Sequence, residues 1–273
     1  MKNGNRPKPS EQLYKNLFWG KNDEESIQLI AEGLVCLLKN SKRLIEDTNL
    51  LVASKRFASA RFLLTTANEE MAKIYILLDM CRLDFKKNES LLRKLCGSFY
   101  NHVLKHAYVE LHRRGNIMVN LRHAKENWEV ETTKWWPNDD PESGEPDMPH
   151  ATVFSREMPL YVDYIEYDQE WWLPSNEDAS SYFGKMSTLL NVLDDAMEFL
   201  KRVEFSHKTG LLEFTSLKIF HDFFQTITIK EDLSRSDLVN IYQEIGKKIF
   251  ETTSIPVKYT MKSIYVGWPL YNF

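Results

Sequence analysis

Two short stretches of this 273-residue chain place carboxylates, lysines and histidines at helical spacing. The first stretch contains Glu69, Glu70 and Lys73, and the second contains His102, Lys105 and His106. Residues four apart share one face of an α-helix, so Glu69 lies beside Lys73 and His102 lies beside His106 if both stretches are helical. Two such helices packed together would bring these groups into one site.

Three chemistries fit this set of side chains. Two histidines and two carboxylates, Glu69, Glu70, His102 and His106, could bind a metal ion. A histidine beside a carboxylate could act as a general acid or base, and the lysines and histidines could contact RNA phosphates. The alternative without a function is an ordinary surface pair of Glu69 and Lys73, with the histidines closing a packed seam.

The composition excludes several classes of protein. Hydrophobic residues make up 43% and charged residues 27% of the chain, as in packed globular proteins. The net charge of -4 removes the case for binding nucleic acid through an overall positive field, although a local basic face is compatible with it. No glycine-rich phosphate loop, Cys-x-x-Cys pair or stretch of about 18 apolar residues occurs, which disfavours nucleotide hydrolysis, structural zinc and a membrane span.

The three cysteines indicate a reducing compartment. Cys36, Cys81 and Cys96 are an odd number and each lies in an apolar stretch, which is typical of reduced core thiols. The first residues contain no apolar core of a signal peptide. We therefore expect a cytoplasmic protein. We also expect no metal and no cofactor, which is a separate expectation.

The spacing of apolar residues predicts an all-α protein. Glycines and prolines are few, with ten of each, and apolar residues recur every three or four positions over long stretches. Four long helices are expected, and they cover about residues 23–54, 57–83, 89–114 and 175–205. The first of them should begin at Asn22 or Asp23, where a capping side chain precedes Glu24 and Glu25.

Changes in composition suggest the domain limits. Residues 1–21 are expected to be a flexible N-terminal segment in which the aromatic stretch 13–19 docks on the body. Residues 22–205 are expected to be a helical bundle and residues 206–273 a small helical C-terminal extension. Residues 128–174 hold six of the ten prolines and five of the seven tryptophans, so they form an insertion in the bundle. The Leu-Tyr-Val-Asp-Tyr-Ile-Glu-Tyr run within it has the alternation of a strand or hairpin.

A basic patch is a second candidate for binding phosphate. His112 is followed by Arg113 and Arg114 at the end of the third expected helix, and Arg122, His123 and Lys125 follow soon after. Cations near a helix C-terminus are also favourable for the helix dipole alone. Both interpretations remain open at this stage.

The chain contains an ordered set of short motifs: a Glu-Asp-x-x-Leu-Leu stretch, a Phe-Ala turn, a Glu-Glu-x-x-Lys helix, a His-x-x-Lys helix and a Tyr-Val-Asp segment that precedes Trp-Leu-Pro. This set resembles the AbiV-type abortive infection proteins. All occur in order, within residues 40–51, 55–61, 67–73, 99–105, 160–163 and 172–174. The resemblance covers about residues 24–205.

The resemblance implies membership of the HEPN superfamily of helical bundles, which recur in phage defence and often form dimers. Many HEPN toxins are metal-independent ribonucleases with an arginine followed, after four to six residues, by a histidine. Arg202 and His207 give the only such spacing here, and His102 has no arginine at that distance. The resemblance also adds weight to Glu69, Glu70, Lys73, His102 and Lys105, which match recurring polar positions of the family.

We therefore expect an abortive-infection effector that blocks growth or translation on infection. RNA cleavage is its candidate mechanism, with His102 or His207 moving a proton and Lys105 or Arg202 stabilising the phosphorane charge. The expected partners are a second copy of the chain, a phage protein activator, and an RNA or ribosome target, with no membrane. The alternative is a non-catalytic helical protein that binds a phage or ribosomal partner.

Overall fold

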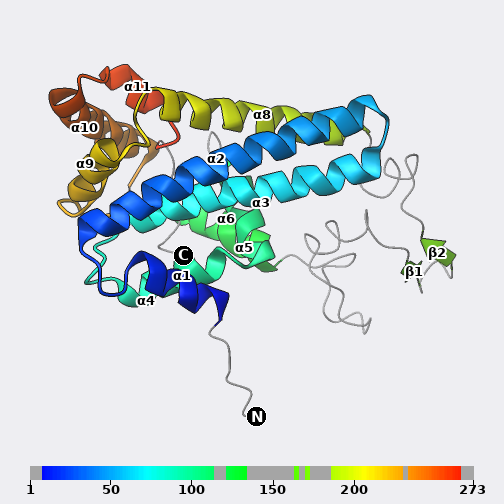
Figure 1. The fold of residues 1–273 in the computed structure, drawn as a ribbon, viewed down its shortest axis with the longest axis horizontal. Coiled ribbons are helices and arrows are strands. Elements are labelled where there is room, and N and C mark those ends of the chain that lie inside the picture. The colour runs from blue at the N-terminus through cyan, green and yellow to red at the C-terminus, as the bar shows by residue number, and fades with distance from the viewer. Residues whose placement is uncertain are drawn as a thin grey trace, which may run out of the picture.

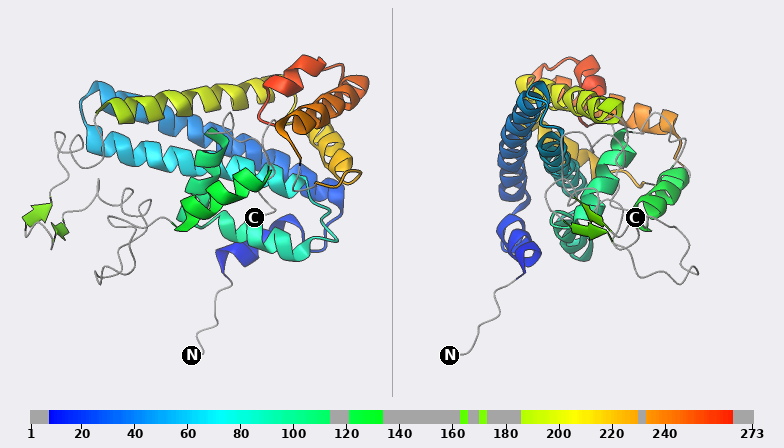
Figure 2. Two further views of the ribbon diagram at one scale, coloured as in Figure 1. Left: turned by 180° about the vertical axis from the view of Figure 1, so that it is seen from behind. Right: turned by 90° about the vertical axis from the view of Figure 1, so that its right-hand side faces the viewer.

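A helical hairpin forms the centre of the protein in a computed structural model of the chain (Figure 1). The structure describes residues 8–113, 121–133, 163–165, 170–172, 186–229 and 233–265. Helices α2 (Asp23–Ala53) and α3 (Phe57–Cys81) run antiparallel, and α8 (Met186–Lys208) lies along them in both views of Figure 2. The all-α fold class expected from the sequence is confirmed.

Helix α2 begins at the cap that its sequence predicts and buries the predicted apolar stripe. The Asn22 side chain accepts a hydrogen bond from the Glu25 backbone amide, and the Glu25 carboxylate accepts one from the Asn22 amide. This reciprocal cap satisfies two amide groups at the start of the helix. The apolar stripe that continues from it is buried as predicted, including Ile27, Ile30, Leu34, Leu37, Leu38, Leu44 and Ile45.

The turn between α2 and α3 uses a left-handed residue. Lys55 has a φ of 59°, and its amide donates to the Val52 carbonyl. The next amide, of Arg56, donates to the Leu51 carbonyl, so two of the last carbonyls of α2 are satisfied. Glycine is the usual residue at such a position, because a side chain strains the left-handed conformation.

The third expected helix is two helices, which corrects the sequence prediction. Helix α4 (Glu89–Ser98) ends at Phe99, and α5 (His102–Arg113) begins three residues later. The Asn101 side chain accepts a hydrogen bond from the Leu104 amide at 3.1 Å and so caps α5. Asparagine is among the preferred caps, which explains why a new helix starts here.

The insertion begins later than expected. Helix α6 (Leu121–Thr133) continues five residues past position 128 and packs on α5, where the Tyr108 and Trp128 rings meet edge to face at 5.3 Å. The expected hairpin is present as β1 (Asp163–Ile165) and β2 (Glu170–Trp172), which pair antiparallel. The remainder of the insertion, and the predicted start of the fourth helix before Met186, lie outside the described residues.

Residues 9–17 of the N-terminal segment are helical, contrary to the flexible segment expected for residues 1–21. Helix α1 (Pro9–Leu17) starts with a proline, which is favourable in the first turn. Its Tyr14 is buried, and the Arg93 guanidinium of α4 lies 3.8 Å from the Tyr14 ring centroid. The Glu11 carboxylate also pairs with Arg93 at 2.5 Å. The docking expected of the stretch 13–19 is confirmed, whereas Glu11 belongs to the polar part that was expected to be mobile.

The C-terminal extension contains α9 (Phe214–Phe224), α10 (Arg235–Thr253) and α11 (Val257–Lys262), gathered at one end of the bundle (Figure 1). The cap predicted at Ser234 is present, since its side chain accepts from the Asp237 amide. No helix among the described residues is long and apolar enough to cross a membrane.

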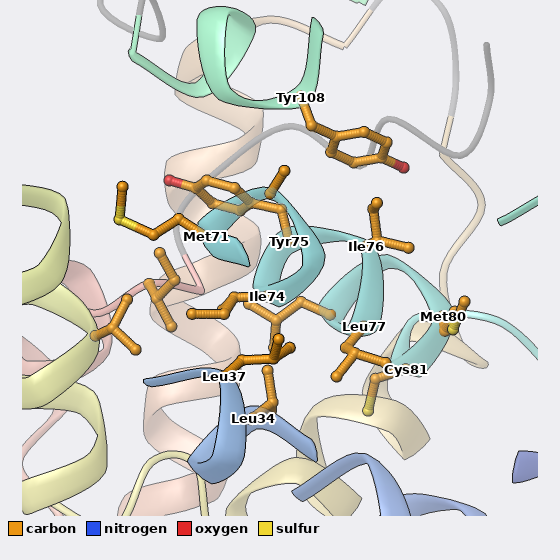
Figure 3. Packing of buried hydrophobic residues seen from close by; sticks show 14 of the residues in the cluster. Leu34, Leu37, Met71, Ile74, Tyr75, Ile76, Leu77, Met80, Cys81 and Tyr108 are labelled. Atoms are coloured by element: carbon orange, nitrogen blue, oxygen red, sulfur yellow. The ribbon is translucent and has the colours of Figure 1, made fainter. Parts of the chain in front are cut away.

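The core is one cluster of buried side chains from α2 and α3 together with α1, α4, α5, α6, α8, α9 and α10. Figure 3 shows part of it, with Tyr75 of α3 and Tyr108 of α5. All three cysteines are free, but only Cys81 and Cys96 are buried, whereas Cys36 is exposed on α2. The prediction of a core thiol was therefore wrong for Cys36. Burial raises the pKa of the Cys81 thiol to about 12, which keeps it protonated.

A candidate acid–base site between α3 and α5

Glu69 joins the two polar stretches of the sequence. One carboxylate oxygen, Oε1, lies 2.8 Å from Nδ1 of His102, and the other, Oε2, accepts a hydrogen bond from Nζ of Lys105 at 2.6 Å. Glu69 comes from α3, and both of its partners come from the first turn of α5. Helix packing thus unites groups that lie 33 and 36 positions apart in the chain.

Exposure differs sharply within this trio. The side chains of Lys105 and Glu69 keep 6% and 10% of their accessible surface, whereas His102 keeps 40%. Because Nδ1 faces Glu69, the second ring nitrogen, Nε2, is the one available to a substrate. A carboxylate that orients the far side of an imidazole is the arrangement by which many enzymes present a histidine for proton transfer.

Opposing effects act on the pKa of Glu69. Burial raises this pKa, but the hydrogen bonds and charges of Lys105 and His102 lower it more, so the pKa of Glu69 lies below its ordinary value. The carboxylate is therefore ionised at neutral pH. An ionised Glu69 keeps its hydrogen bond to Nδ1 and stabilises a positive imidazole.

Lys105 differs from its expected role. Its ammonium is buried against Glu69 and is directed at that carboxylate, so it cannot also bind a phosphate at the surface without leaving its partner. Its contribution is to hold Glu69 ionised and in position. The phosphorane-stabilising role expected for Lys105 does not agree with this geometry.

Glu70 and Lys73 form a separate pair on the next face of α3. The Lys73 ammonium lies 2.5 Å from Glu70 Oε1, and the amide of Asn40 on α2 donates to Glu70 Oε2 at 3.1 Å. The expected pairing of Lys73 with Glu69 was wrong, because Glu69 faces α5. No spacing rule connects Asn40 with Glu70, so this contact could not be predicted from the sequence.

Lys73 also contacts the turn between α4 and α5. Its ammonium lies 5.0 Å from the centroid of the Phe99 ring. The Phe99 ring lies in turn 5.7 Å from that of Tyr100, two residues before His102. The Glu70–Lys73 pair therefore supports the turn that carries His102.

Arg202 and His207 are not part of this site. They lie five residues apart on α8, so they point about 140° apart around the helix. The Arg202 guanidinium donates to the backbone carbonyl of Ser263 at 3.1 Å, and Nδ1 of His207 is buried with no hydrogen-bond partner. Among the described residues, neither makes a hydrogen bond or ion pair to Glu69, His102 or Lys105.

The residues considered for a metal site have different partners. Glu69 faces His102, Glu70 faces Lys73, and Nε2 of His106 lies 3.8 Å from Glu131 on α6. No group of three or more metal-ligating side chains occurs in the part of the chain that the structure describes. The expected set of four ligands is therefore not brought together.

Of the basic patch expected at the end of α5, the structure describes the His112 side chain, whereas the side chains of Arg113 and Arg114 lie outside the described residues. The His112 ring stacks on Tyr75 with centroids 3.4 Å apart and planes within 5°, and its Nε2 is buried without a partner. Burial, together with the charges of Arg82 and Arg202, lowers the pKa of His112 well below its ordinary value. A neutral, stacked ring of this kind is a packing residue and not a cation for binding phosphate.

The described residues form a bundle of helices with a carboxylate, a histidine and a lysine between α3 and α5, and this fold class agrees with the HEPN class that the sequence resembles. A family model described as AbiV, within HEPN, matches residues 29–191, which is more than half of the chain. The chain therefore belongs to the AbiV family of HEPN proteins, as its motifs suggested. Searches of the curated proteins and of the solved structures gave no significant match.

The extent of the match bears on the two candidate sites. Glu69, Glu70, Lys73, His102 and Lys105 all lie inside residues 29–191, whereas Arg202 and His207 lie outside them. The Glu69–His102–Lys105 trio and the neighbouring Glu70–Lys73 pair thus lie within the residues that the family model matches.

Proposed function

We propose that this protein is an abortive-infection effector that acts in the cytoplasm and blocks growth or translation by metal-independent RNA cleavage at His102. The observation that supports the proposal is the 2.8 Å contact of His102 Nδ1 with Glu69, which leaves Nε2 of a partly exposed imidazole for substrate. Membership of the AbiV family supplies the context of phage defence.

The chemistry needs one proton acceptor at the surface. Nε2 of His102 takes the proton of a ribose 2′-hydroxyl as that oxygen attacks the adjacent phosphorus. The bond to the 5′-oxygen of the next nucleotide breaks, and that oxygen takes a proton from water. The products are a 2′,3′-cyclic phosphate and a 5′-hydroxyl, and His102 then returns its proton to water.

Glu69 and Lys105 are positioning residues in this mechanism. The Glu69 carboxylate fixes the tautomer of His102 and stabilises the imidazolium that forms after proton transfer. Lys105 keeps Glu69 ionised. We further propose that a second copy of the chain forms a homodimer with it, and that a phage protein triggers activity on an RNA or ribosome target.

The decisive experiment incubates the purified protein with total RNA and with tRNA in the presence of EDTA. Wild type should yield fragments with cyclic phosphate ends, and His102→Asn should yield at most about one hundredth as much, since general acid–base catalysis contributes at least that factor. His123→Asn is the matched control, because His123 is 42% exposed and lies 3.5 Å from Glu126 on α6. The control should cleave like wild type.

Two results would count against His102 as the catalytic residue. Cleavage by His102→Asn at the wild-type rate would remove it from the mechanism. Loss of cleavage in Arg202→Ala or His207→Ala, with His102→Asn active, would move the site to α8.

A non-catalytic role is the second candidate. It is favoured by the burial of Lys105, since the trio then presents a single proton-transfer group at the surface. In this case the helical surface binds a phage or ribosomal partner. Growth arrest on induction with intact RNA in wild type, His102→Asn and Arg202→Ala would support binding and exclude cleavage, and unchanged plating of a broad phage panel would exclude phage defence itself.

A further inference from the structure

Tyr100 is an exposed aromatic side chain beside the candidate acid–base residue. It keeps 47% of its accessible surface, and among the described residues only Trp19 and Phe250 are aromatic side chains of comparable exposure. Tyr100 lies in the turn between α4 and α5, two positions before His102. The Cα atoms of residues so close in the chain are at most about 7 Å apart.

Hydrogen bonds of the turn fix the backbone at Tyr100. The Tyr100 amide donates to the Gly97 carbonyl at 3.1 Å, and the next amide, of Asn101, donates to the Ser98 carbonyl at 3.2 Å. The Asn101 side chain caps α5 on the other side. Such a platform costs little conformational entropy when a ligand stacks on it.

The neighbours of Tyr100 support one side of the ring and leave the remainder to solvent. Phe99 packs against the core, and its ring is tilted by 59° to that of Tyr100 at 5.7 Å. The Lys73 ammonium lies over the Phe99 ring, with Glu70 beside it. Partial burial raises the pKa of the Tyr100 phenol, so the ring is neutral at physiological pH.

We infer that Tyr100 is a base-stacking platform that selects unpaired RNA and places the ribose next to it at His102. This inference rests on the proposed function, because it names the substrate class of the same site. A neutral, exposed aromatic ring stacks on any unpaired base, whereas bases inside a duplex are stacked on one another and do not reach it. Tyr100 thereby acts as a positioning residue and not in proton transfer.

Binding to a short unpaired RNA tests the inference. Each protein carries His102→Asn to prevent cleavage, and affinity is measured by fluorescence anisotropy with a labelled hexanucleotide and with the same sequence in a duplex. Tyr100→Leu should weaken binding of the unpaired RNA about 5- to 140-fold, as removal of one stacked base costs in other proteins. Tyr100→Phe should bind within about twofold of the parent, since it keeps the ring.

Two controls separate stacking from a general change in the surface. Phe250→Leu removes an aromatic side chain that is 50% exposed on α10 and should leave affinity unchanged. Duplex affinity should not respond to Tyr100→Leu. A 2-aminopurine base in the hexanucleotide should lose fluorescence on binding the parent protein and the Tyr100→Phe variant alike, because both keep an aromatic ring. It should retain its fluorescence with Tyr100→Leu.

Turnover of the proteins that retain His102 distinguishes failure of this inference from failure of the proposed function. Tyr100→Leu should raise KM and leave kcat within about threefold of wild type, because Tyr100 positions substrate without moving a proton. RNA cleavage with a KM that does not depend on Tyr100 would overturn the stacking role and leave the ribonuclease standing. Absence of both binding and cleavage in wild type would overturn both.

Discussion

Arg82, the residue directly after α3, donates a hydrogen bond to the hydroxyl of Tyr242 on α10 at 3.1 Å, across 160 positions of the chain. The same guanidinium pairs with Asp79 and donates to the Tyr265 carbonyl, while Asp79 accepts from Tyr108 of α5 at 3.0 Å. A continuous buried chain of hydrogen bonds thus joins the C-terminal extension to the helix that begins with His102.

Removal of Arg82 should destabilise the fold strongly. Arg82→Leu leaves Asp79 charged and buried without its cation, which typically costs about 3–5 kcal/mol of unfolding free energy. Tyr242→Phe removes a single hydrogen bond and should cost about 1 kcal/mol. Urea unfolding measures both, with Lys247→Ala in the exposed Glu244 pair as a control that changes little. An Arg82→Leu protein as stable as the control would contradict this account.

The Glu69–Lys105 pair should show coupling. Lys105→Met and Glu69→Gln should each destabilise by about 3 kcal/mol, since each leaves a buried partner uncompensated, whereas the double variant should recover much of the loss. Additive losses would mean that the two groups do not interact energetically.

The same pair gives stability a dependence on acid pH. The folded pKa of Glu69 lies below its ordinary value of 4.5, so its contribution is present above pH 4.5 and is lost as the pH falls through the folded pKa. Urea unfolding at pH 6 and pH 4 should show a smaller acid loss in Glu69→Gln than in wild type. Equal losses would show that Glu69 does not titrate differently on unfolding.

Burial of His112 should lower the free energy of unfolding at mildly acidic pH, in a range above that of Glu69. The unfolded imidazole gains a proton below about pH 6.5, whereas burial and the nearby arginines lower the folded pKa. The contribution of this group to stability is therefore nearly constant well above pH 6.5 and falls as the pH drops through 6.5, with a loss of about 1.4 kcal/mol between pH 8 and pH 5.5. His112→Phe keeps a ring against Tyr75 and should remove this part of the loss between pH 8 and 5.5. A wild type and variant with parallel stability curves would refute the assignment.

The left-handed turn at Lys55 offers a stabilising change. Lys55→Gly should raise the unfolding free energy by about 0.5–1 kcal/mol, because relief of the strain at φ 59° exceeds the entropy cost of glycine. Lys55→Ala serves as the comparison, since it keeps the Cβ atom and should not stabilise. A gain in the alanine variant equal to that in the glycine variant would exclude backbone strain as the cause.

Local patterns determined much of what could be predicted. The spacing of apolar residues predicted α2 and α3 with their buried faces, and the caps at Asn22 and Ser234 were visible because a capping side chain and its helix are neighbours in the chain. The break at Asn101 was equally local, but the apolar pattern continues across it, so one helix was expected where two exist. Ordered motifs sufficed for the family, since each is a short stretch.

Only the tertiary structure decided which polar groups meet. Helical spacing makes both Glu69 and Glu70 neighbours of Lys73, and it is the packing of α5 on α3 that assigns Glu69 to His102 and Lys105 and leaves Glu70 for Lys73. The Arg82–Tyr242 contact likewise joins helices with no local relation. Sequence spacing sets the direction of a side chain around its own helix, whereas its partner on another helix depends on how the helices dock, which the whole core determines.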